Sequence, residues 1–262
     1  MMHSKKDEKT QEYKEDVHML KREDWGFTNP VVSDLYGKPP LVWKDMDIHL
    51  VVYETDIENI EKVIPEPLEA RTNKVFVWQS HFDLGTTQGA FSETAIYVQV
   101  KYKDYEADYE PFLYVDSHLP LTAGREIWGY QKKMAEKIEI VHEMEAVRAQ
   151  TNRLGHQIVK ALVVPRYIAD MNEIPWSRDG VFSLKYIPSA EENGEPLRQL
   201  ILTPGEFTAQ EGKFFGGPAS VTFERSEIDP TYLLEPKKIL GGYYGKGDLY
   251  LPFGKIVCDY KD

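Results

Sequence analysis

The chain contains a single cysteine and no long apolar run. With Cys258 alone among 262 residues, no internal disulfide and no cysteine-based metal cluster can form. The alternating stretch 255–260 around it is typical of a half-buried strand position rather than a reactive thiol. A membrane helix requires roughly 18 consecutive apolar residues, and no run approaches that length. The composition therefore argues against a membrane protein.

Basic residues are scarce relative to acidic ones. Thirty-one Lys and Arg stand against 43 Asp and Glu, which gives a formal net charge of −12. Nucleic acids and anionic membranes require a basic surface, so neither is an expected partner. The first 16 residues are charged and lack the apolar segment of a secretory signal, which predicts a cytoplasmic location.

The composition divides the chain into a tail and one domain. Residues 1–24 are dominated by Lys, Glu and Asp and predict a charged N-terminal tail. Residues 25–262 contain neither an internal repeat nor a break in composition, so we expect a single domain. Glycines and prolines among apolar residues predict an ordered, irregular segment over 25–40.

Strand patterns prevail in the predicted domain. Many strands at short intervals with few helices indicate a mainly β (α+β) fold, either a barrel or a sandwich. Residues rich in β-branched and aromatic side chains predict strands at 47–53, 75–82, 94–102, 112–118, 137–142, 157–167, 181–187, 197–202, 219–224 and 248–260.

Two helices are expected. Residues 55–58 (Thr-Asp-Ile-Glu) form a capping-box pattern, and Ile57, Ile60 and Ile64 would share one face of a short helix that Pro65 ends. The second predicted helix begins near Thr122 and includes residues 125–128.

Several familiar catalytic motifs are absent. The chain has no G-x-S-x-G, no G-x-x-x-x-G-K-[ST], no G-x-G-x-x-G and no H-E-x-x-H, and its seven histidines are dispersed without ligand spacing. No metal site is therefore predicted. The glycine-rich stretch 241–247 leads into a strand rather than a helix, which favours a flexible hairpin connection over a phosphate-binding loop.

One segment carries a pattern with chemical meaning. Lys132 and Lys133 close a helix-like stretch that contains Trp128 and Tyr130, and a strand follows. Most adjacent lysines are solvated surface residues, but this context favours at least one ammonium lying against apolar surface. A desolvated lysine, or one beside another cation, is more readily a free amine and can attack a carbonyl to form a Schiff base.

The same segment, G-R-E-x-x-x-Y-x-K-K over 124–133, resembles the active-site region of the acetoacetate decarboxylase family. Acetoacetate decarboxylase is itself the known example of a lysine activated by desolvation or by a neighbouring cation. Further matches follow the family's order and extend over nearly all of 47–260. They are 53–56 (YETD), 63–68 (VIPEPL), 91–94 (FSET), 114–116 (YVD), 251–252 (LP) and 257–260 (VCDY).

The resemblance implies a cone-like antiparallel β-barrel with a few flanking helices, a large homo-oligomer, and neither an organic cofactor nor a metal. Lys132 matches the family's Schiff-base lysine, and Lys133 matches the neighbour credited with activating it. Glu93 matches an active-site glutamate that orients the substrate or shuttles a proton. Because adjacent residues of a strand point in opposite directions, we expect burial to activate Lys132 more than Lys133 does.

The chain departs from the family pattern at two positions. The family arginine thought to hold the substrate carboxylate falls at Met46, and a second family glutamate falls near Val77 or Trp78. Met46 and Trp78 would suit a larger or less charged carbonyl compound. Arg125 is a further candidate for substrate binding, with an ion pair to Glu126 as the structural alternative. Arg22, Lys38 and Lys44 in the preceding segment are possible substitutes for the missing arginine.

These observations predict a carbon–carbon lyase that forms a Schiff base through Lys132, assisted by Lys133 and Glu93. The expected reaction is decarboxylation of a small keto acid of the acetoacetate type. Two alternatives stay open: an aldolase or dehydratase reaction with the same lysine, and a non-catalytic barrel that binds a hydrophobic small molecule.

Overall fold

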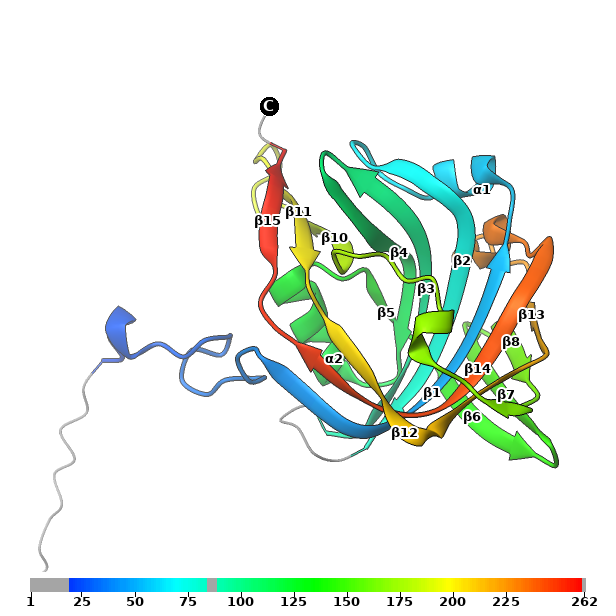
Figure 1. Cartoon of the computed structure of the whole chain (residues 1–262). Coiled ribbons are helices and arrows are strands. Elements are labelled where there is room, and N and C mark those ends of the chain that lie inside the picture. Colours follow the sequence, from blue (N-terminus) through cyan, green and yellow to red (C-terminus); the bar gives the residue numbers. More distant parts are fainter. Residues whose placement is uncertain (1–18, 84–88, 261–262) are drawn as a thin grey trace, which may run out of the picture. The chain divides into compact units, whose positions relative to one another are not determined.

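The computed structural model describes residues 19–83 and 89–260, and these residues are mainly β with few helices (Figure 1). The chain divides into two compact units, 1–35 and 36–262. Residues 1–18 of the predicted tail lie outside the described residues, and the predicted boundary at residue 24 stays a prediction. In the first unit, η1 (Arg22–Asp24) is a 3-10 turn, and the Thr28 hydroxyl accepts a hydrogen bond of 2.7 Å from the Leu35 backbone NH.

An eleven-stranded sheet makes up most of the second unit. Its long central strands lie side by side and bend strongly along their length (Figure 1). The strands are β1 (Leu41–Glu54), β2 (Glu69–Phe82), β3 (Phe91–Tyr102), β4 (Tyr105–Val115), β5 (Lys132–Met134), β9 (Tyr167–Ile168), β10 (Val181–Ile187), β11 (Leu197–Thr203), β12 (Glu206–Gly217), β14 (Lys238–Leu251) and β15 (Lys255–Asp259).

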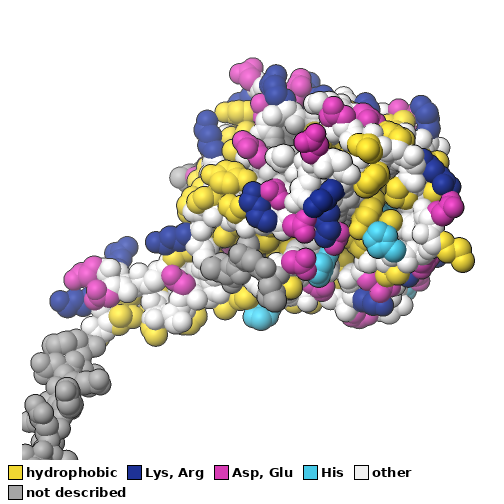
Figure 2. All heavy atoms as spheres, turned by 60° about the horizontal axis from the view of Figure 1, so that its bottom comes forward, with side chains coloured by type: hydrophobic (Ala, Val, Ile, Leu, Met, Phe, Trp, Pro, Cys, Tyr) yellow, Lys and Arg dark blue, Asp and Glu magenta, His cyan; other side chains and the backbone are white. Residues whose placement is uncertain are grey.

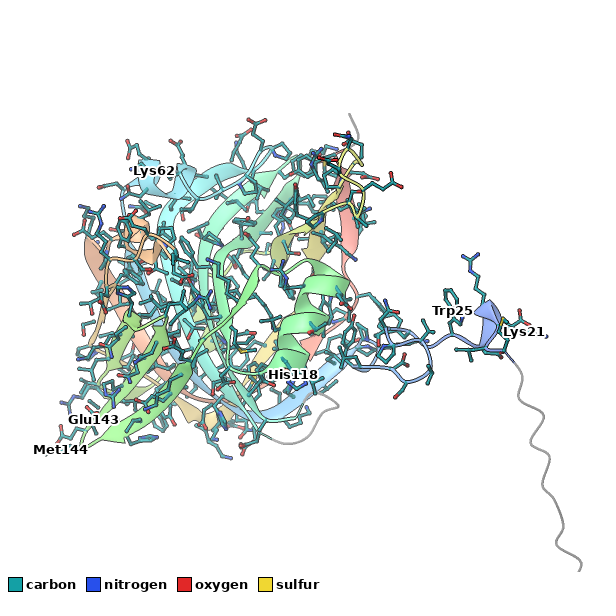
Figure 3. The ribbon with its side chains drawn as sticks, turned by 180° about the vertical axis from the view of Figure 1, so that it is seen from behind. Lys21, Trp25, Lys62, His118, Glu143 and Met144 are labelled. Carbon is teal, nitrogen blue, oxygen red and sulfur yellow. The ribbon has the colours of Figure 1, made fainter. Side chains whose placement is uncertain are left out.

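A four-stranded sheet and a few short helices complete this unit. The smaller sheet contains β6 (Lys137–Glu143), β7 (Ala146–Arg153), β8 (His156–Val163) and β13 (Ala219–Thr222). Glu143 and Met144 mark the outer end of its β6–β7 hairpin, and His118 marks the start of α2 (Figure 3). The helical elements are α1 (Ile57–Glu61), α2 (His118–Ala123), the π-helical turn η2 (Gly124–Trp128), and the 3-10 turns η3 (Met171–Glu173) and η4 (Thr231–Leu234).

The large sheet is not the purely antiparallel, closed barrel that the resemblance implied. Strand β4 pairs in parallel with both β5 and β10. Parallel neighbours need a long connection, and α2 and η2 lie between β4 and β5 in the sequence. The hydrogen-bonded order runs from β15 to β9, and within the described residues these two end strands are not paired with each other. Closure into a barrel is therefore not confirmed. Register shifts within β1 and between β2 and β3 accompany the strong bending of the sheet.

Both faces of the central strands are buried, as the alternation along each strand dictates. On one face, Val51 and Val98 belong to a core cluster that also includes Val159 and Val163 of the smaller sheet. Ile96, Val98 and Val100, which alternate along β3, also belong to this cluster. On the other face lies an aromatic cluster whose residues include Trp43, Trp78, Phe82, Phe91, Trp128 and Tyr130.

The glycine-rich stretch 241–247 is part of strand β14, so the predicted hairpin connection is wrong. It pairs with β1 on one side and β12 on the other. A Cβ at Gly242 would lie 2.4 Å from the Cβ of Ala219, and one at Gly245 would lie 2.1 Å from the carbonyl oxygen of Lys213. The glycines thus permit close approach of neighbouring segments rather than a turn.

Helix α1 begins where it was expected but ends at Glu61, so Ile64 lies outside it and Pro65 does not end it. The predicted capping box does not form. Asp56 is the N-cap residue and makes no side-chain capping hydrogen bond. The Thr55 hydroxyl instead donates a 2.7 Å hydrogen bond to the carbonyl oxygen of Glu235. A tertiary contact has replaced the local one.

One face of the larger unit mixes both signs of charge. Figure 2 shows Lys and Arg side chains interspersed with Asp, Glu and hydrophobic side chains over the larger unit. Among the described residues, no helix has the length and apolar character needed to cross a membrane.

We predict that His49 makes stability depend on pH. Its buried Nε2 hydrogen-bonds the Val147 carbonyl oxygen at 3.1 Å, and burial lowers the pKa of His49 from 6.5 to about 4. Between these values the unfolded chain binds a proton that the folded chain does not, so stability falls as the pH falls through this window. His49 should account for about 3 kcal/mol of the loss in unfolding free energy between pH 7 and pH 4.

Urea unfolding of wild type and His49→Gln at both pH values measures this contribution, because the glutamine amide can still donate to Val147. An equal loss of stability in the two proteins would contradict the prediction.

Candidate active site

The predicted lysine segment is a helical turn followed by a short strand. Turn η2 ends at Gly129, whose φ of 77° is a left-handed conformation that glycine adopts without strain. A Cβ there would lie 2.2 Å from the Cα of Lys185, so a side chain has no room. The chain then enters β5, where Lys132 pairs with Leu113 of β4.

Three hydrogen bonds hold this segment in place. The Arg125 guanidinium donates to the carbonyl oxygen of Lys132 at 3.2 Å. The Trp128 indole donates to the carbonyl oxygen of Pro252 at 2.8 Å, and the Ser183 hydroxyl donates to the Trp128 carbonyl at 2.7 Å. These three hydrogen bonds therefore fix the backbone of the segment that carries Lys132.

Lys132 and Glu93 form a largely buried ion pair. The Lys132 ammonium donates to Glu93 Oε2 at 2.7 Å, and the two side chains are only 9% and 13% exposed. The rings of Phe91 and Tyr130 lie 5.8 and 6.0 Å from the ammonium nitrogen. In such surroundings a charge depends on its partner, because water does not solvate it fully.

The ion pair lines a cavity of about 450 Å³, a volume that suits a small organic molecule. Much of its wall is aromatic, and carboxyl groups interrupt the apolar surface. The aromatic lining residues are Trp43, Trp78, Phe82, Phe91, Tyr97, Tyr130, Trp176 and Phe207, and the acidic ones are Glu93, Asp108, Glu110 and Glu206.

Glu110 is a lining residue that the sequence interpretation missed. Its side chain is buried, and it hydrogen-bonds the Tyr97 hydroxyl. Burial, followed by the nearby Glu93 carboxylate, raises the pKa of Glu110 from 4.5 to about 8, although Lys132 acts in the opposite direction. Glu110 therefore holds a proton at neutral pH.

Asp108, also missed, lies two residues earlier on the same strand. Burial raises its pKa from 3.8 to about 6, against hydrogen bonds from Ser177. The Ser177 hydroxyl donates to Asp108 Oδ1 at 2.7 Å. An acidic pair spaced i, i+2 in a strand places both carboxyls on one face, and this spacing was the available signal. The predicted strand began at residue 112 and left both residues outside it.

Lys133 faces away from the cavity of Lys132. Its ammonium donates to Asp229 Oδ1 at 2.8 Å and to the Ile228 carbonyl oxygen at 2.9 Å. Asp229 is fully buried and also accepts from Arg153 at 2.9 Å. The two lysine side chains thus point in opposite directions, as expected. That Lys133 helps to activate Lys132 stays a prediction.

The remaining predicted residues have different surroundings. Trp78 lines the cavity. Met46 is fully buried in the aromatic core cluster and is not among the described lining residues. Arg125 contacts the Lys132 backbone, whereas Glu126 accepts a hydrogen bond from the Tyr36 hydroxyl, so the proposed Arg125–Glu126 ion pair is not observed.

The described lining of the cavity includes one Lys or Arg, which is Lys132. No cation there takes the place of the family arginine. The described residues also contain no group of three or more His, Cys, Asp or Glu side chains arranged to hold a metal ion.

An amine and several carboxyl groups in a largely aromatic cavity are typical of an enzyme site. The family model for acetoacetate decarboxylase matches residues 27–260. The chain therefore belongs to the acetoacetate decarboxylase family.

Individual relatives support this family assignment. An acetoacetate decarboxylase of Burkholderia mallei (strain NCTC 10229) is 25% identical over 244 residues, which cover 89% of this chain and 95% of the relative. The crystal structure of an acetoacetate decarboxylase from Legionella pneumophila superposes with a TM-score of 0.79 at 27% identity, over 87% of this chain and 91% of that one. An acetoacetate decarboxylase-like enzyme from Sphingomonas wittichii RW1 shares the fold, with a TM-score of 0.78 at 14% identity over 89% and 98% of the two chains.

We predict that Gly124→Ala displaces the lysine without unfolding the protein. Gly124 has ordinary helical dihedral angles, which alanine tolerates. The added Cβ would lie 2.7 Å from Cδ and Cε of Lys132, so the flexible lysine side chain must move. Trapping of a Lys132 adduct with pyruvate and borohydride should slow by on the order of 10²-fold, because a small misplacement of a reacting group is costly.

Gly241→Ala is the control, since its nearest atom would lie at 3.6 Å, an ordinary contact. Unaltered trapping in Gly124→Ala would show that the glycine does not determine the position of Lys132.

Proposed function

We propose that the protein is a carbon–carbon lyase that forms a Schiff base between Lys132 and a small keto acid, with decarboxylation of the acetoacetate type as its reaction. The observation that carries the proposal is the buried Lys132–Glu93 pair inside the cavity. Family membership and the names of the relatives support a decarboxylase.

The first step requires a neutral amine. Glu93 Oε2, 2.7 Å from the Lys132 nitrogen, is placed to accept the ammonium proton. The free amine adds to the substrate carbonyl to give a carbinolamine. Protonated Glu93 returns its proton to the carbinolamine hydroxyl, and loss of water leaves an iminium ion and the Glu93 carboxylate. The buried site supplies Glu93 as the anion that balances this positive charge.

The second step uses the iminium ion as an electron sink. The bond between the α-carbon and the carboxylate breaks, CO₂ leaves, and the electron pair forms an enamine instead of a carbanion. Protonation of the enamine carbon and hydrolysis of the iminium then release the product and restore Lys132. The aromatic wall, which includes Phe82 and Phe91, limits water during these steps.

A second candidate reaction is aldol addition followed by dehydration through the same lysine. The cavity composition favours it, because Lys132 is the one cation in the described lining and several carboxyl groups surround it. A substrate carboxylate would enter without a dedicated cationic partner, which is costly in an apolar site. An enamine formed from one carbonyl compound could instead attack an aldehyde.

The test is reductive trapping. Incubation with acetoacetate or pyruvate plus borohydride should give a covalent adduct on Lys132, located by peptide mass spectrometry. Lys132→Met should give no adduct at this position. Lys238→Met, which alters an exposed lysine on β14, should label like the wild type.

Release of CO₂ from acetoacetate distinguishes the two reactions. CO₂ together with the adduct supports decarboxylation, and an adduct without CO₂ supports the aldol reaction. A folded wild-type protein that forms no adduct would contradict the Schiff base for these substrates and favour a binding protein.

A further inference from the structure

Glu110 combines burial, access to the cavity and an unsatisfied oxygen atom. It lies on β4 and lines the cavity, yet its side chain is buried. Its carboxyl group hydrogen-bonds the Tyr97 hydroxyl, while its Oε2 atom has no hydrogen-bond partner among the described residues. A buried polar atom left unpaired is costly, above all when it is charged, which favours the neutral, protonated form of this carboxyl group.

The protonation of Glu110 depends on burial and on the titratable groups around it. These groups are Glu93 and Tyr97 on β3, Asp108 on β4, Lys132 on β5 and Tyr130 in the segment before β5. Burial and the carboxylate of Glu93 favour the protonated acid, against the opposite influence of Lys132. The pKa of about 8 means that Glu110 carries its proton at neutral pH and loses it as the pH rises through that value. A group with a pKa close to the working pH is well suited to both give and take a proton.

We propose that Glu110 is a catalytic acid–base residue, which protonates the enamine carbon of a substrate held on Lys132 and removes that proton in the reverse direction. This inference rests on the proposed Schiff-base function. It assigns separate tasks to two carboxyl groups: Glu93 exchanges a proton with the lysine nitrogen, and Glu110 exchanges one with the substrate carbon.

The step balances. The electron pair of the enamine double bond forms a new C–H bond with the Glu110 proton, and the O–H bond of the carboxyl breaks. The nitrogen lone pair of Lys132 restores the iminium ion, and Glu110 is left as a carboxylate. Solvent returns a proton to Glu110, and hydrolysis of the iminium releases the ketone.

Acetone in D₂O is a suitable probe, because it carries no carboxylate and requires no second substrate. When Glu110 exchanges the abstracted proton with D₂O before the return step, deuterium is placed on the methyl carbon, which NMR detects. Glu110→Gln keeps the size of the side chain and can still bond Tyr97, but it has no acidic proton. Exchange should slow by about 10²-fold or more, while borohydride trapping of acetone on Lys132 stays near the wild-type level.

Two further variants make the result specific. Glu110→Asp retains an acid and should exchange faster than Glu110→Gln. Glu58→Gln, an exposed carboxyl on α1, controls for the loss of one negative charge and should behave as wild type.

Wild-type exchange in Glu110→Gln would overturn the inference. Parallel loss of trapping and exchange in Glu110→Gln and Glu110→Asp would also overturn it, since Glu110 would then serve to build the lysine site. Failure of the wild type itself to be trapped by acetone would instead refute the Schiff-base function, and the role of Glu110 would fall with it.

Discussion

The site depends on one constraint: a lysine ammonium and a glutamate carboxylate are held together with little access to water. Removing two charges from water costs several kcal/mol for each ion, and only close pairing offsets that cost. At 2.7 Å, Lys132 and Glu93 satisfy this condition. The same low polarity raises the pKa of Glu110, so the ion pair and the protonated acid are two results of one environment.

Adjacent side chains of a strand point to opposite faces, so Lys132 and Lys133 lie in different surroundings although they are chemically alike. Lys132 faces the aromatic cavity, whereas Lys133 bonds Asp229 and Ile228 on the opposite side of β5. Because Asp229 is buried and also pairs with Arg153, the charge of Lys133 is part of a separate network. Burial and Glu93 therefore define the immediate electrostatic surroundings of Lys132.

Local patterns in the sequence predicted the parts of the structure that local chemistry determines. The mainly β class, helix α1 and the juxtaposition of Lys132 with Glu93 were accessible from pattern or family resemblance. Features that depend on contacts between distant segments could not be predicted in this way. Glu110 enters the site because β3, β4 and β5 are neighbours in one sheet, and the glycines of 241–247 fit because other segments approach β14 closely. Whether a sheet closes into a barrel likewise depends on pairing between strands that are distant in the sequence.

The division of the site between segments has a consequence for how the family diversifies. The hydrogen bonds that anchor the nucleophile come from Arg125, Trp128 and Ser183, whereas the acidic and aromatic wall is drawn largely from other strands. Substitutions at wall positions such as Trp78 and Phe207 can remodel the cavity while the lysine keeps its support. The architecture thus allows single substitutions in the cavity wall to change substrate preference without altering the residues that hold Lys132.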